Sequence, residues 1–375
     1  MASLLDDRAM AQRIFDHIEA GTTDLSDELW REPVESYRSE ARLRQEIERV
    51  LRRTPSAFCP SAALPEPGSY LAREAAGTPL LAVRGSDRVV RVFRNACRHR
   101  GMRVADGSGC AAAFSCRYHG WTYGLDGALR HVPHADGFPG LERERHGLVP
   151  VRAVERRGLV WVTQDPAGPE DGALDDLPEL LADDLRLFAA RENVVGANWK
   201  IFLEGFLEGY HIKTTHPESF YPYGFDNLNV IEYFGRNSRV TYPFQRIRKL
   251  ASVPPEERRV DGALTYVYQL FPNAIVAVLS RHTVFTVLEP ISLGETRLCS
   301  FAMARGAGEG SGAGTDEQAL RDAAFVNQTG AGEDAAMVQA IQRGLASGAN
   351  ESFVYGRFEG AIAHFHRSLH AALEA

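Results

Sequence analysis

The sequence contains no hydrophobic run long enough to cross a lipid bilayer. Its longest apolar run, residues 274–279, is far shorter than the roughly 20 residues that a spanning helix requires. The first 15 residues carry four charges and no continuous apolar stretch, which differs from the pattern of a signal peptide. We therefore expect a cytoplasmic protein without a membrane partner.

Positive charge is not in excess, and cysteine is scarce. Lys and Arg number 42 against 49 Asp and Glu, so the formal net charge of -7 gives no reason to expect a nucleic-acid partner. Five cysteines are an odd number in a chain that lacks a secretion signal, which disfavours a disulfide framework. Cysteines that bind a metal as thiolates are a better interpretation than disulfides. The cysteines of the chain are Cys59, Cys97, Cys110, Cys116 and Cys299.

The length of 375 residues fits two domains. Short β-rich runs cut by turn dipeptides between residues 71 and 163 predict a small antiparallel β domain, and residues 165–185 are typical of a connection. The second half mixes helix and strand patterns, so the expected fold class is α+β. Helices are expected at 39–53, 199–213, 318–346 and 358–373, strands at 240–242, 265–270, 274–280 and 283–288, and a flexible glycine-rich loop at 305–315.

Two short motifs carry metal-ligand side chains, Cys97-Arg98-His99 and Cys116-Arg117-Tyr118-His119. A structural zinc site also uses two Cys and two His, but zinc fingers usually keep the cysteines in one pair and the histidines in the other. Mixed pairs let both Cys bind one iron and both His the other, as a Rieske [2Fe-2S] cluster requires. Glycines beside both motifs allow tight turns. A Rieske cluster is therefore the first hypothesis, and Cys110 is interpreted as a small buried side chain or a spectator.

The segment 198–217 holds a second set of candidate ligands. On a helix, Glu204, Glu208 and His211 fall on one face because their spacings are four and three. Periodicity alone is equally consistent with a solvent-exposed face. His216 would point away from His211 on an unbroken helix, but Pro217 biases the preceding residue out of helical geometry. The chain can then turn back and bring both imidazoles to one metal.

A third ligand is expected from the helix near residues 334–345. A mononuclear iron that activates oxygen typically binds two His and one carboxylate. Projection at about 100° per residue places Asp334 at the centre of an apolar stripe that is expected to be buried, and Glu333 to one side of it. A carboxylate aimed into the core is costly unless it binds something, so Asp334 is the predicted ligand; the alternative is a carboxylate favoured by the helix dipole. The stripe consists of Met337, Val338, Ile341 and Leu345.

Other metal-site hypotheses have less support. Glu208 and His211 form the Glu-x-x-His unit of di-iron bundles, but such sites need two copies, and no other histidine has a glutamate three residues before it. His366 and His370 are one turn apart on the last expected helix and could bind a metal. The sequence offers no third ligand near them, so this remains a minor hypothesis.

These motifs together, from about Pro65 to the C-terminus, resemble the Rieske non-haem iron oxygenases, specifically the catalytic α subunits of ring-hydroxylating dioxygenases and related carnitine-type monooxygenases. The family's iron motif is an acidic residue, two residues, a His, four residues and a second His. It fits Glu208, His211 and His216, and the family's distal Asp fits Asp334.

The resemblance also implies a domain organisation. Residues 1–55 would form a helical segment that packs on the catalytic domain, and residues 56–165 a small antiparallel-β Rieske domain. Residues 166–375 would form a helix-grip (START-like) catalytic domain with an antiparallel sheet and long C-terminal helices.

Three residues depart from the family pattern. Arg117 stands where a proline or another small residue is more common in the second cluster motif. Glu208 replaces the commoner Asp at the bridging position, as in relatives that act on carnitine-like substrates. Gly205 replaces the usual Asn, which removes a side-chain amide near the iron and changes the hydrogen bonds available there.

The resemblance implies an oxygenase that uses O2 and electrons from a separate flavin/iron-sulfur reductase, with or without a ferredoxin. NAD(P)H would then serve only indirectly. In the family, the cluster of one subunit faces the iron of its neighbour in a trimer, and a carboxylate bridges an imidazole of each. The resemblance thus implies a homotrimer in which His119, Glu208 and His211 form an electron relay across the subunit interface.

The substrate is the least determined part of the prediction. Phe220, Tyr221, Tyr223 and Asn227 follow His216 and are expected to line the pocket, where aromatic rings suit an arene or, through cation-π contact, a quaternary ammonium group. Monooxygenation, oxidative demethylation and cis-dihydroxylation all stay open. Other classes also stay open, namely a Rieske electron carrier, which would need only about 100 residues, a helix-grip ligand-binding module without oxygenase activity, and a zinc-stabilised scaffold.

Overall fold

A computed structural model describes residues 4–169, 171–305, 317–328 and 330–375 of the chain. It divides the chain into two compact units. Unit 1 comprises Met1–Leu51, Gly172–Leu180 and Asp184–Ala375, and unit 2 comprises Arg52–Asp171 and Leu181–Asp183. The loop expected at 305–315 lies outside the described residues except for its first position. The predicted domain limits at residues 55 and 165 stay a prediction.

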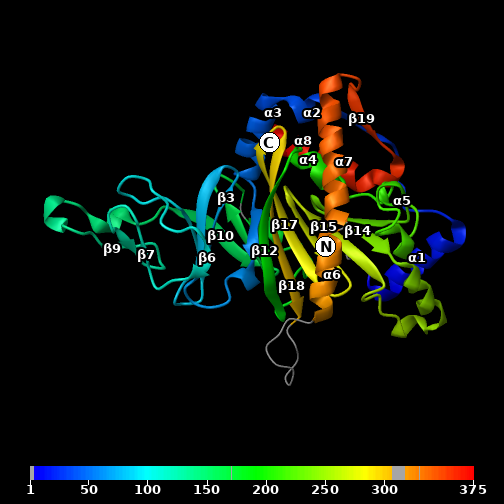
Figure 1. Cartoon of the computed structure of the whole chain (residues 1–375), viewed down its shortest axis with the longest axis horizontal. Helices are drawn as coiled ribbons and strands as arrows, with labels where there is room; N and C mark the ends of the chain where they lie inside the picture. The colour runs from blue at the N-terminus through cyan, green and yellow to red at the C-terminus, as the bar shows by residue number, and fades with distance from the viewer. Residues whose placement is uncertain (1–3, 170, 306–316, 329) are drawn as a thin grey trace. The chain divides into compact units, whose positions relative to one another are not determined.

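Unit 2 is built from antiparallel strands, as its short β-rich runs predicted (Figure 1). Seven strands form one sheet in the order β2-β11-β10-β5-β4-β3-β6, and three short strands form a second sheet in the order β7-β8-β9. Their bounds are β2 (Ser56–Pro60), β3 (Ser69–Ala75), β4 (Thr78–Arg84), β5 (Val90–Arg94), β6 (Gly107–Cys110), β7 (Phe114–Ser115), β8 (Thr122–Tyr123), β9 (Leu129–His131), β10 (Pro150–Arg156) and β11 (Leu159–Thr163).

Unit 1 contains a second seven-stranded antiparallel sheet, in the order β12-β18-β17-β16-β15-β14-β13. Consecutive strands from β13 to β18 pair as hairpins, and β12 joins the far edge through β18. Along β17 buried and half-buried residues alternate at first, which is the period-two pattern of a pleated strand. The strands are β12 (Leu185–Val195), β13 (Val230–Phe234), β14 (Asn237–Pro243), β15 (Leu264–Leu270), β16 (Ala274–Val278), β17 (Thr283–Ser292) and β18 (Glu295–Arg305).

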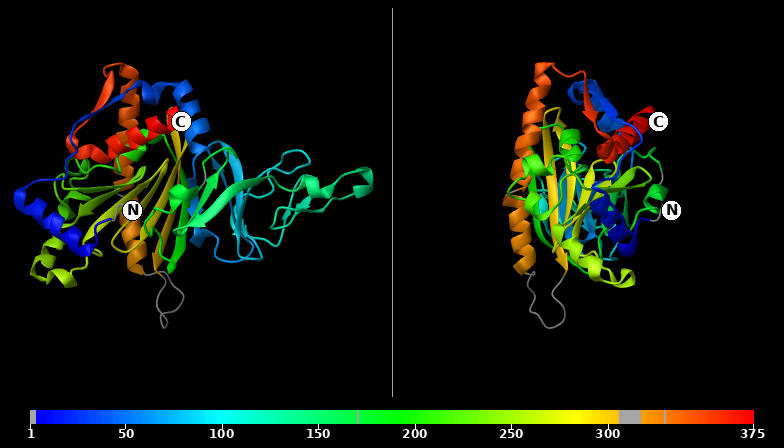
Figure 2. Two further views of the ribbon diagram at one scale, coloured as in Figure 1. Left: turned by 180° about the vertical axis from the view of Figure 1, so that it is seen from behind. Right: turned by 90° about the vertical axis from the view of Figure 1, so that its right-hand side faces the viewer.

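Helices cover both faces of this sheet. Figure 2 shows α6 and α7 along one face and α8 on the other side. A small two-stranded sheet pairs β1 (Trp30–Pro33) with β19 (Ser352–Tyr355), which joins the beginning of the chain to its end. The described helices are α1 (Asp7–Ala20), α2 (Glu35–Arg38), α3 (Glu40–Gln45), α4 (Trp199–Glu204), α5 (Ile212–Thr215), α6 (Glu317–Gln328), α7 (Gly330–Gly344) and α8 (Gly360–Glu374), with a π-helical turn over Glu46–Leu51.

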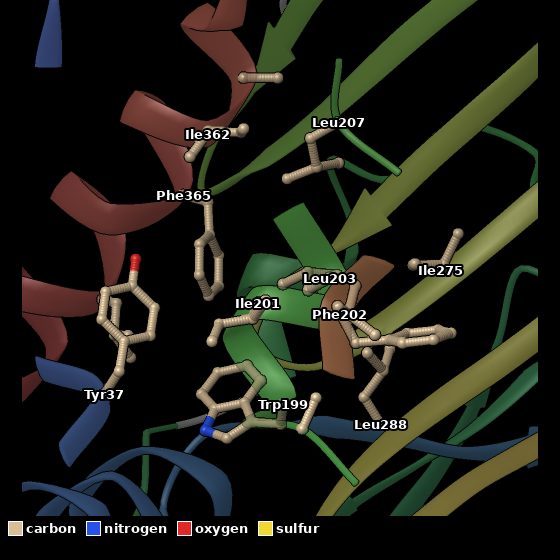
Figure 3. Close-up of a cluster of buried hydrophobic side chains, with 14 of the residues drawn as sticks. Tyr37, Trp199, Ile201, Phe202, Leu203, Leu207, Ile275, Leu288, Ile362 and Phe365 are labelled. Carbon is tan, nitrogen blue, oxygen red and sulfur yellow. The ribbon is translucent and has the colours of Figure 1, made fainter. Parts of the chain in front are cut away.

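The core of unit 1 forms around α4. All six residues of this short helix are buried, and Figure 3 shows Trp199, Ile201, Phe202 and Leu203 between α8 and the sheet. Trp199 packs edge-on against Phe365 of α8, with ring centroids 5.7 Å apart. The expected α+β fold, with antiparallel sheets and long C-terminal helices, is confirmed.

The helix expected over 199–213 is interrupted. It exists as α4 and α5, and residues 205–211 between them are not helical. Glycines at positions 205 and 209 lower the helical propensity of this stretch. The carbonyl of Phe206 accepts a hydrogen bond from the Tyr242 hydroxyl at 2.8 Å, and the Glu208 carboxylate accepts from the backbone N–H groups of Tyr210 and His211. These side chains replace the helical hydrogen bonds and set the path of the chain toward His211.

Candidate active site and metal centres

His211 and His216 lie at the two ends of α5. His211 precedes the first residue of the helix, and His216 follows the last, with φ -117° and ψ 45°. The predicted departure of His216 from helical geometry before Pro217 is therefore observed. The ring centroids are 5.2 Å apart, so the turn brings both imidazoles to the same place.

Asp334 of α7 completes a group of three donors. Its Oδ1 lies 2.9 Å from Nε2 of His216 and 3.8 Å from Nε2 of His211. The three donor atoms all lie within 4.8 Å of one another. Nε2 of His216 is buried and has no partner in hydrogen-bond geometry, although the carboxylate is close. Ligand atoms that converge around a buried nitrogen without a hydrogen bond fit a metal ion. Two His and one carboxylate form a ligand set that is typical of oxygen-activating iron.

A carboxylate holds the second nitrogen of each imidazole. Oε1 of Glu208 contacts Nδ1 of His211, and Oε2 of Glu333 lies 2.7 Å from Nδ1 of His216. The Ser219 hydroxyl donates to the same Glu333 oxygen at 2.6 Å. Such partners direct the metal-facing Nε2 atoms and raise their basicity.

Neighbouring charges and hydrogen bonds shift the pKa values of His216 and Glu333 in the metal-free chain. Burial lowers the pKa of His216, but the nearby negative charge of Asp334 and the hydrogen bond and charge of Glu333 outweigh it, so the net shift is upward. Hydrogen bonds from Ser219 and His216 lower the pKa of Glu333. A metal ion must therefore displace a proton that these two carboxylates help to hold.

Sequence reasoning gave Glu333 no role. The helical projection places it beside the apolar stripe and predicts Asp334 as the ligand. The structure shows that this sideways position reaches the far nitrogen of His216. The only sequence signal was the adjacency of two acidic residues at the start of a helix.

The two Cys/His motifs form two loops of matching geometry in unit 2. In the first loop, Cys97 N–H donates to the carbonyl of Met102 at 2.7 Å and its own carbonyl accepts from Gly101 at 2.8 Å. In the second, Cys116 makes the same two bonds with Trp121 and Gly120, at 2.8 and 2.9 Å. Both glycines have positive φ, +79° and +73°, so the tight turns require glycine as expected.

The four side chains converge without surrounding a single point. The His99 and His119 rings are 4.7 Å apart, and Cys97 and Cys116 are both buried in one core cluster. Among the described residues, the only sets of three donors within 4.8 Å of one another lie elsewhere. A single zinc ion needs ligand atoms that all lie close to one another. A two-iron cluster is bound at two separate iron atoms, so its ligands lie farther apart. The residues therefore fit the cluster better than zinc.

Aromatic groups enclose the cluster loops. Trp121 stacks on His99 with centroids 5.0 Å apart, and Nδ1 of His99 is buried without a hydrogen-bond partner. The Tyr123 hydroxyl lies 3.3 Å from Sγ of Cys97 and accepts from the N–H of Arg98. Burial and this sulfur contact raise the pKa of Tyr123, so the hydroxyl stays protonated beside the sulfur. Cys110 is exposed, so the expectation that its side chain is buried was wrong, and its reading as a spectator stays a prediction.

The expected pocket residues are found in different surroundings. Phe220 packs against His216 with centroids 4.8 Å apart, and it also occupies the space in which a side chain at position 330 would lie. Tyr223 is largely exposed. Tyr221 lies under the ammonium group of Lys213, and Asn227 has a positive φ of +48°. Of the four, Phe220 is the one whose ring contacts a candidate ligand.

A second group of possible metal ligands consists of Glu32, His366 and His370. The expectation that no third ligand lies near the two histidines was wrong. Glu32 belongs to β1, more than 330 residues earlier in the chain, and His370 contacts it at 3.1 Å. Local spacing could not reveal this contact, because it depends on the pairing of β1 with β19.

Known proteins resemble this chain in sequence. Residues 54–148 match the family model of the Rieske [2Fe-2S] domain. The carnitine monooxygenase oxygenase subunit of Escherichia coli (strain K12) is 34% identical over 200 residues, which cover 51% of this chain and 53% of the relative. Biphenyl 2,3-dioxygenase subunit alpha of Rhodococcus jostii (strain RHA1) is 34% identical over 192 residues, 48% of this chain and 42% of the relative. The chain thus spans about half the length of these relatives.

Solved structures share the fold. A quaternary ammonium Rieske monooxygenase in complex with an inhibitor superposes with a TM-score of 0.79 at 22% identity, covering 94% of this chain and 96% of the other. Naphthalene 1,2-dioxygenase from Rhodococcus sp. gives a TM-score of 0.76 at 18% identity, covering 98% of each chain. None of the described helices is long and apolar enough to cross a membrane.

The cofactors follow from the two matched domains. They are a Rieske [2Fe-2S] cluster and a mononuclear iron, and the donor sets in units 2 and 1 fit them. Residues 182–375 match the family model described as ring hydroxylating alpha subunit (catalytic domain). The chain belongs to this ring hydroxylating alpha subunit family.

Proposed function

We propose that this chain is the oxygenase component of a Rieske non-haem iron oxygenase. It hydroxylates a small organic molecule with O2 and with electrons from a separate reductase. The observation that carries the proposal is the convergence of His211, His216 and Asp334 within 4.8 Å. In this proposal they hold the mononuclear iron, and Cys97, His99, Cys116 and His119 hold the cluster.

The chain's own residues prepare both sites. When bound, the two metal centres supply one-electron transfer and the reduction of O2. Glu208 and Glu333 fix the imidazole rings, so that each Nε2 faces the metal position. A set of only three protein ligands leaves coordination positions open for O2.

Glu208 is also the proposed electron bridge between subunits. Its carboxylate contacts His211 and accepts two backbone hydrogen bonds. A carboxylate has about four acceptor positions, so one remains for an imidazole from outside. His119 is exposed on its loop and available to a neighbouring subunit. A homotrimer in which His119 of one chain meets Glu208 of another fits these two observations.

The proposed substrate is an arene or a quaternary ammonium compound. Relatives named for carnitine and for biphenyl match this chain at the same 34% identity. The Phe220 ring beside His216 offers an apolar and π-rich surface, which suits either class. Monooxygenation, oxidative demethylation and dihydroxylation are distinguished by the product. The partner is a flavin/iron-sulfur reductase in the cytoplasm, with or without a ferredoxin.

Oxygen consumption tests this proposal. The purified chain, a reductase of this class and NADH are combined with carnitine-like compounds and arenes, and products are identified by mass spectrometry with 18O2. We expect one substrate to stimulate O2 uptake and to carry 18O in its product or to lose a methyl group. An electron carrier or a binding module would take up no substrate-dependent O2, and that result would refute the proposal.

A further inference from the structure

A buried carboxylate in unit 1 has no role in the proposed iron site. Glu32 of β1 is completely buried. It accepts hydrogen bonds from the Ser36 hydroxyl at 2.6 Å and the Trp30 indole N–H at 3.1 Å. Burial raises the pKa of Glu32, but the hydrogen bond from His370 and the charge of His366 outweigh it and lower the pKa to about 2. Glu32 is therefore ionised in the folded protein.

His370 connects Glu32 to the surface of unit 1. Its Nε2 lies 3.1 Å from both Glu32 oxygens, and its side chain is 32% exposed. Nδ1 lies 3.3 Å from Nη2 of Arg42. A guanidinium group only donates, so Nδ1 accepts and the ring proton is on Nε2, directed at Glu32.

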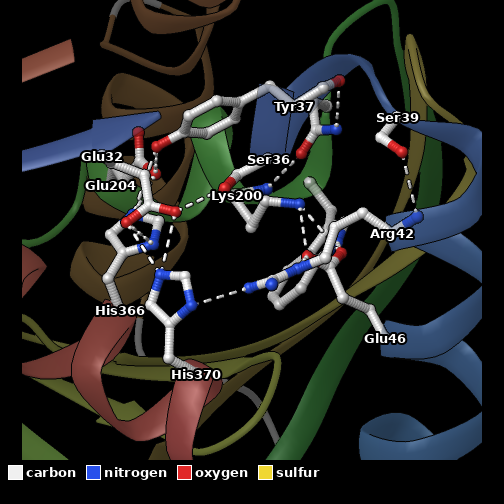
Figure 4. A network of polar contacts seen from close by, with 12 residues as sticks. Glu32, Ser36, Tyr37, Ser39, Arg42, Glu46, Lys200, Glu204, His366 and His370 are labelled. Carbon is white, nitrogen blue, oxygen red and sulfur yellow. Dashed lines mark hydrogen bonds and ion pairs between the residues drawn. The ribbon is translucent and has the colours of Figure 1, made fainter. Parts of the chain in front are cut away.

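His366 stands between Glu32 and a second buried carboxylate, that of Glu204 (Figure 4). Nε2 of His366 lies 2.8 Å from Oε1 of Glu204. Nδ1 lies 3.4 Å from Oε2 of Glu32 but is buried without a partner in hydrogen-bond geometry. The hydroxyls of Tyr37 and Tyr355 each donate to Glu204 at 2.8 Å. One proton added to Nδ1 would complete the bridge between the two carboxylates.

A proton suits this place better than a metal ion. Glu32, His366 and His370 are close enough to share a cation, but a metal needs a lone pair on Nε2 of His370. The contact with Arg42 places the ring proton on that nitrogen.

The charges around the bridge lead to the same conclusion. The third buried carboxylate, Glu46, pairs with Lys200 and Arg42. Glu32, Glu204 and Glu46 thus outnumber the two permanent cations, so a proton on His366 reduces the net negative charge of the group.

Two segments of the chain connect the surroundings of the bridge with the candidate iron site. Glu204 ends α4, in the same segment that continues to Glu208 and His211. Glu359, directly before α8, has a pKa raised to about 7 by burial and by the charges of Glu208 and Glu204, while the hydrogen bond from the Gly356 N–H and the charge of His211 lower it. Glu359 also lies beside the iron-site segment, because the neighbouring ring of Phe358 packs on Tyr210 with centroids 4.6 Å apart.

We propose that His366, held between Glu32 and Glu204, is the relay of a proton path that runs from His370 toward the site of His211, His216 and Asp334. This inference rests on the proposed function. Monooxygenation and dihydroxylation each take up two electrons and two protons per O2. The first gives one product hydroxyl and water, and the second gives a diol. The reductase supplies the electrons, and the path supplies protons from solvent. His366 is a positioning residue for protons and does not contact the substrate.

The first test compares His366→Gln with His364→Gln. The control histidine is two residues away on α8, packs against Tyr233 and is outside the bridge. We expect both variants to keep their iron and their visible spectrum. His366→Gln should slow product formation by about 100-fold, most strongly at high pH, and should increase the solvent deuterium isotope effect. His364→Gln should keep both wild-type values. A wild-type pH profile and isotope effect in folded His366→Gln would overturn the proposal.

A second variant and an NMR measurement test the relay if His366→Gln does not fold or the enzyme shows no activity. If His366→Gln does not fold, His370→Gln at the exposed end should show the same pH-dependent loss, and a wild-type profile there would also overturn the relay. Histidine 15N NMR of the metal-free chain needs no activity. The His366 signals should report a proton on both ring nitrogens, and a neutral ring without a proton on Nδ1 would refute the bridge. If wild-type enzyme oxidises nothing while His366 carries both protons, the proposed function fails and the proton site stands.

Discussion

Each candidate histidine ligand has a carboxylate of its own. Glu208 holds Nδ1 of His211, and Glu333 holds Nδ1 of His216 with help from Ser219. These contacts fix which nitrogen of each ring is free for metal. Iron affinity at this site therefore depends on two residues that do not touch the metal position.

Replacement of Glu333 by Gln should weaken iron binding without unfolding the chain. The amide keeps the side-chain volume but removes the negative charge that holds the ring proton of His216, so the expected loss of iron affinity is about 10-fold to 100-fold. Iron retention during dialysis against a chelator measures it. Glu218→Gln, at an exposed carboxylate beside the same loop, is the control. Equal retention in the two variants would contradict a role for Glu333.

The pH dependence of the metal-free chain follows from His216. Its pKa is raised above the ordinary 6.5, so the folded state binds the proton more tightly than the unfolded state. The stability from this group is fully present below pH 6.5 and is lost as pH rises through the folded-state pKa. The melting temperature of the metal-free chain should fall in that range. Iron binding should instead weaken as pH falls, since the metal displaces this proton. A melting profile that is unchanged in His216→Gln would contradict this assignment.

Two local elements determine where the ligands lie. The interruption between α4 and α5 places His211 and His216 at opposite ends of one short helical turn. The paired loops of unit 2 each need a glycine of positive φ four residues after the cysteine. Both features are backbone conformations that orient the ligand side chains before any metal binds.

The loop glycines allow a matched comparison. Gly101→Ala meets open space and should cost about 1 kcal/mol through its positive φ alone. Gly120→Ala has the same backbone strain, and its Cβ also lies 3.0 Å from Cγ of Pro133. We therefore expect a lower melting temperature and less bound cluster in Gly120→Ala than in Gly101→Ala, measured by calorimetry and visible absorption. The reverse order would show that the turn at Gly101 carries the greater strain.

Local spacing predicted the elements that depend on near neighbours. Intervals of a few residues indicated the mixed Cys/His pairs, the departure of His216 from helical geometry before Pro217 and the choice of Asp334. The buried stripe used to choose Asp334 was wrong in part, because Met337 and Ile341 are exposed and Asp334 is only half-buried. The break in the helix after Glu204 is stabilised in part by the distant Tyr242, and the contact of Glu32 with His370 depends on the pairing of β1 with β19. Such distant contacts leave no periodic signal, so Glu333, Glu32 and the broken helix were missed.

At the scale of the whole molecule, the chain separates two kinds of metal chemistry into two compact units. The Cys/His loops belong to unit 2, and the His211, His216 and Asp334 group belongs to unit 1. If electrons pass between subunits of a trimer, a defect in one unit can be compensated by an intact unit of a neighbour.

Mixed oligomers test this arrangement. Cys116→Ser removes a cluster ligand and His211→Ala removes an iron ligand, so each variant alone should be inactive. Co-expressed in one oligomer, they should regain a clear fraction of the wild-type rate, because an intact cluster of one chain can serve the intact iron site of another. Absence of recovery in verified mixed oligomers would place electron transfer within one chain.

Iron stoichiometry tests the central claim, a cluster and a separate mononuclear site in one chain, most directly. Wild-type protein should contain about three irons per chain, two in the cluster and one at the triad. Asp334→Ala should contain about two, with the visible absorption of the cluster unchanged, and should oxidise no substrate. Retention of three irons in Asp334→Ala, or loss of the cluster together with the third iron, would contradict a separate mononuclear site at Asp334.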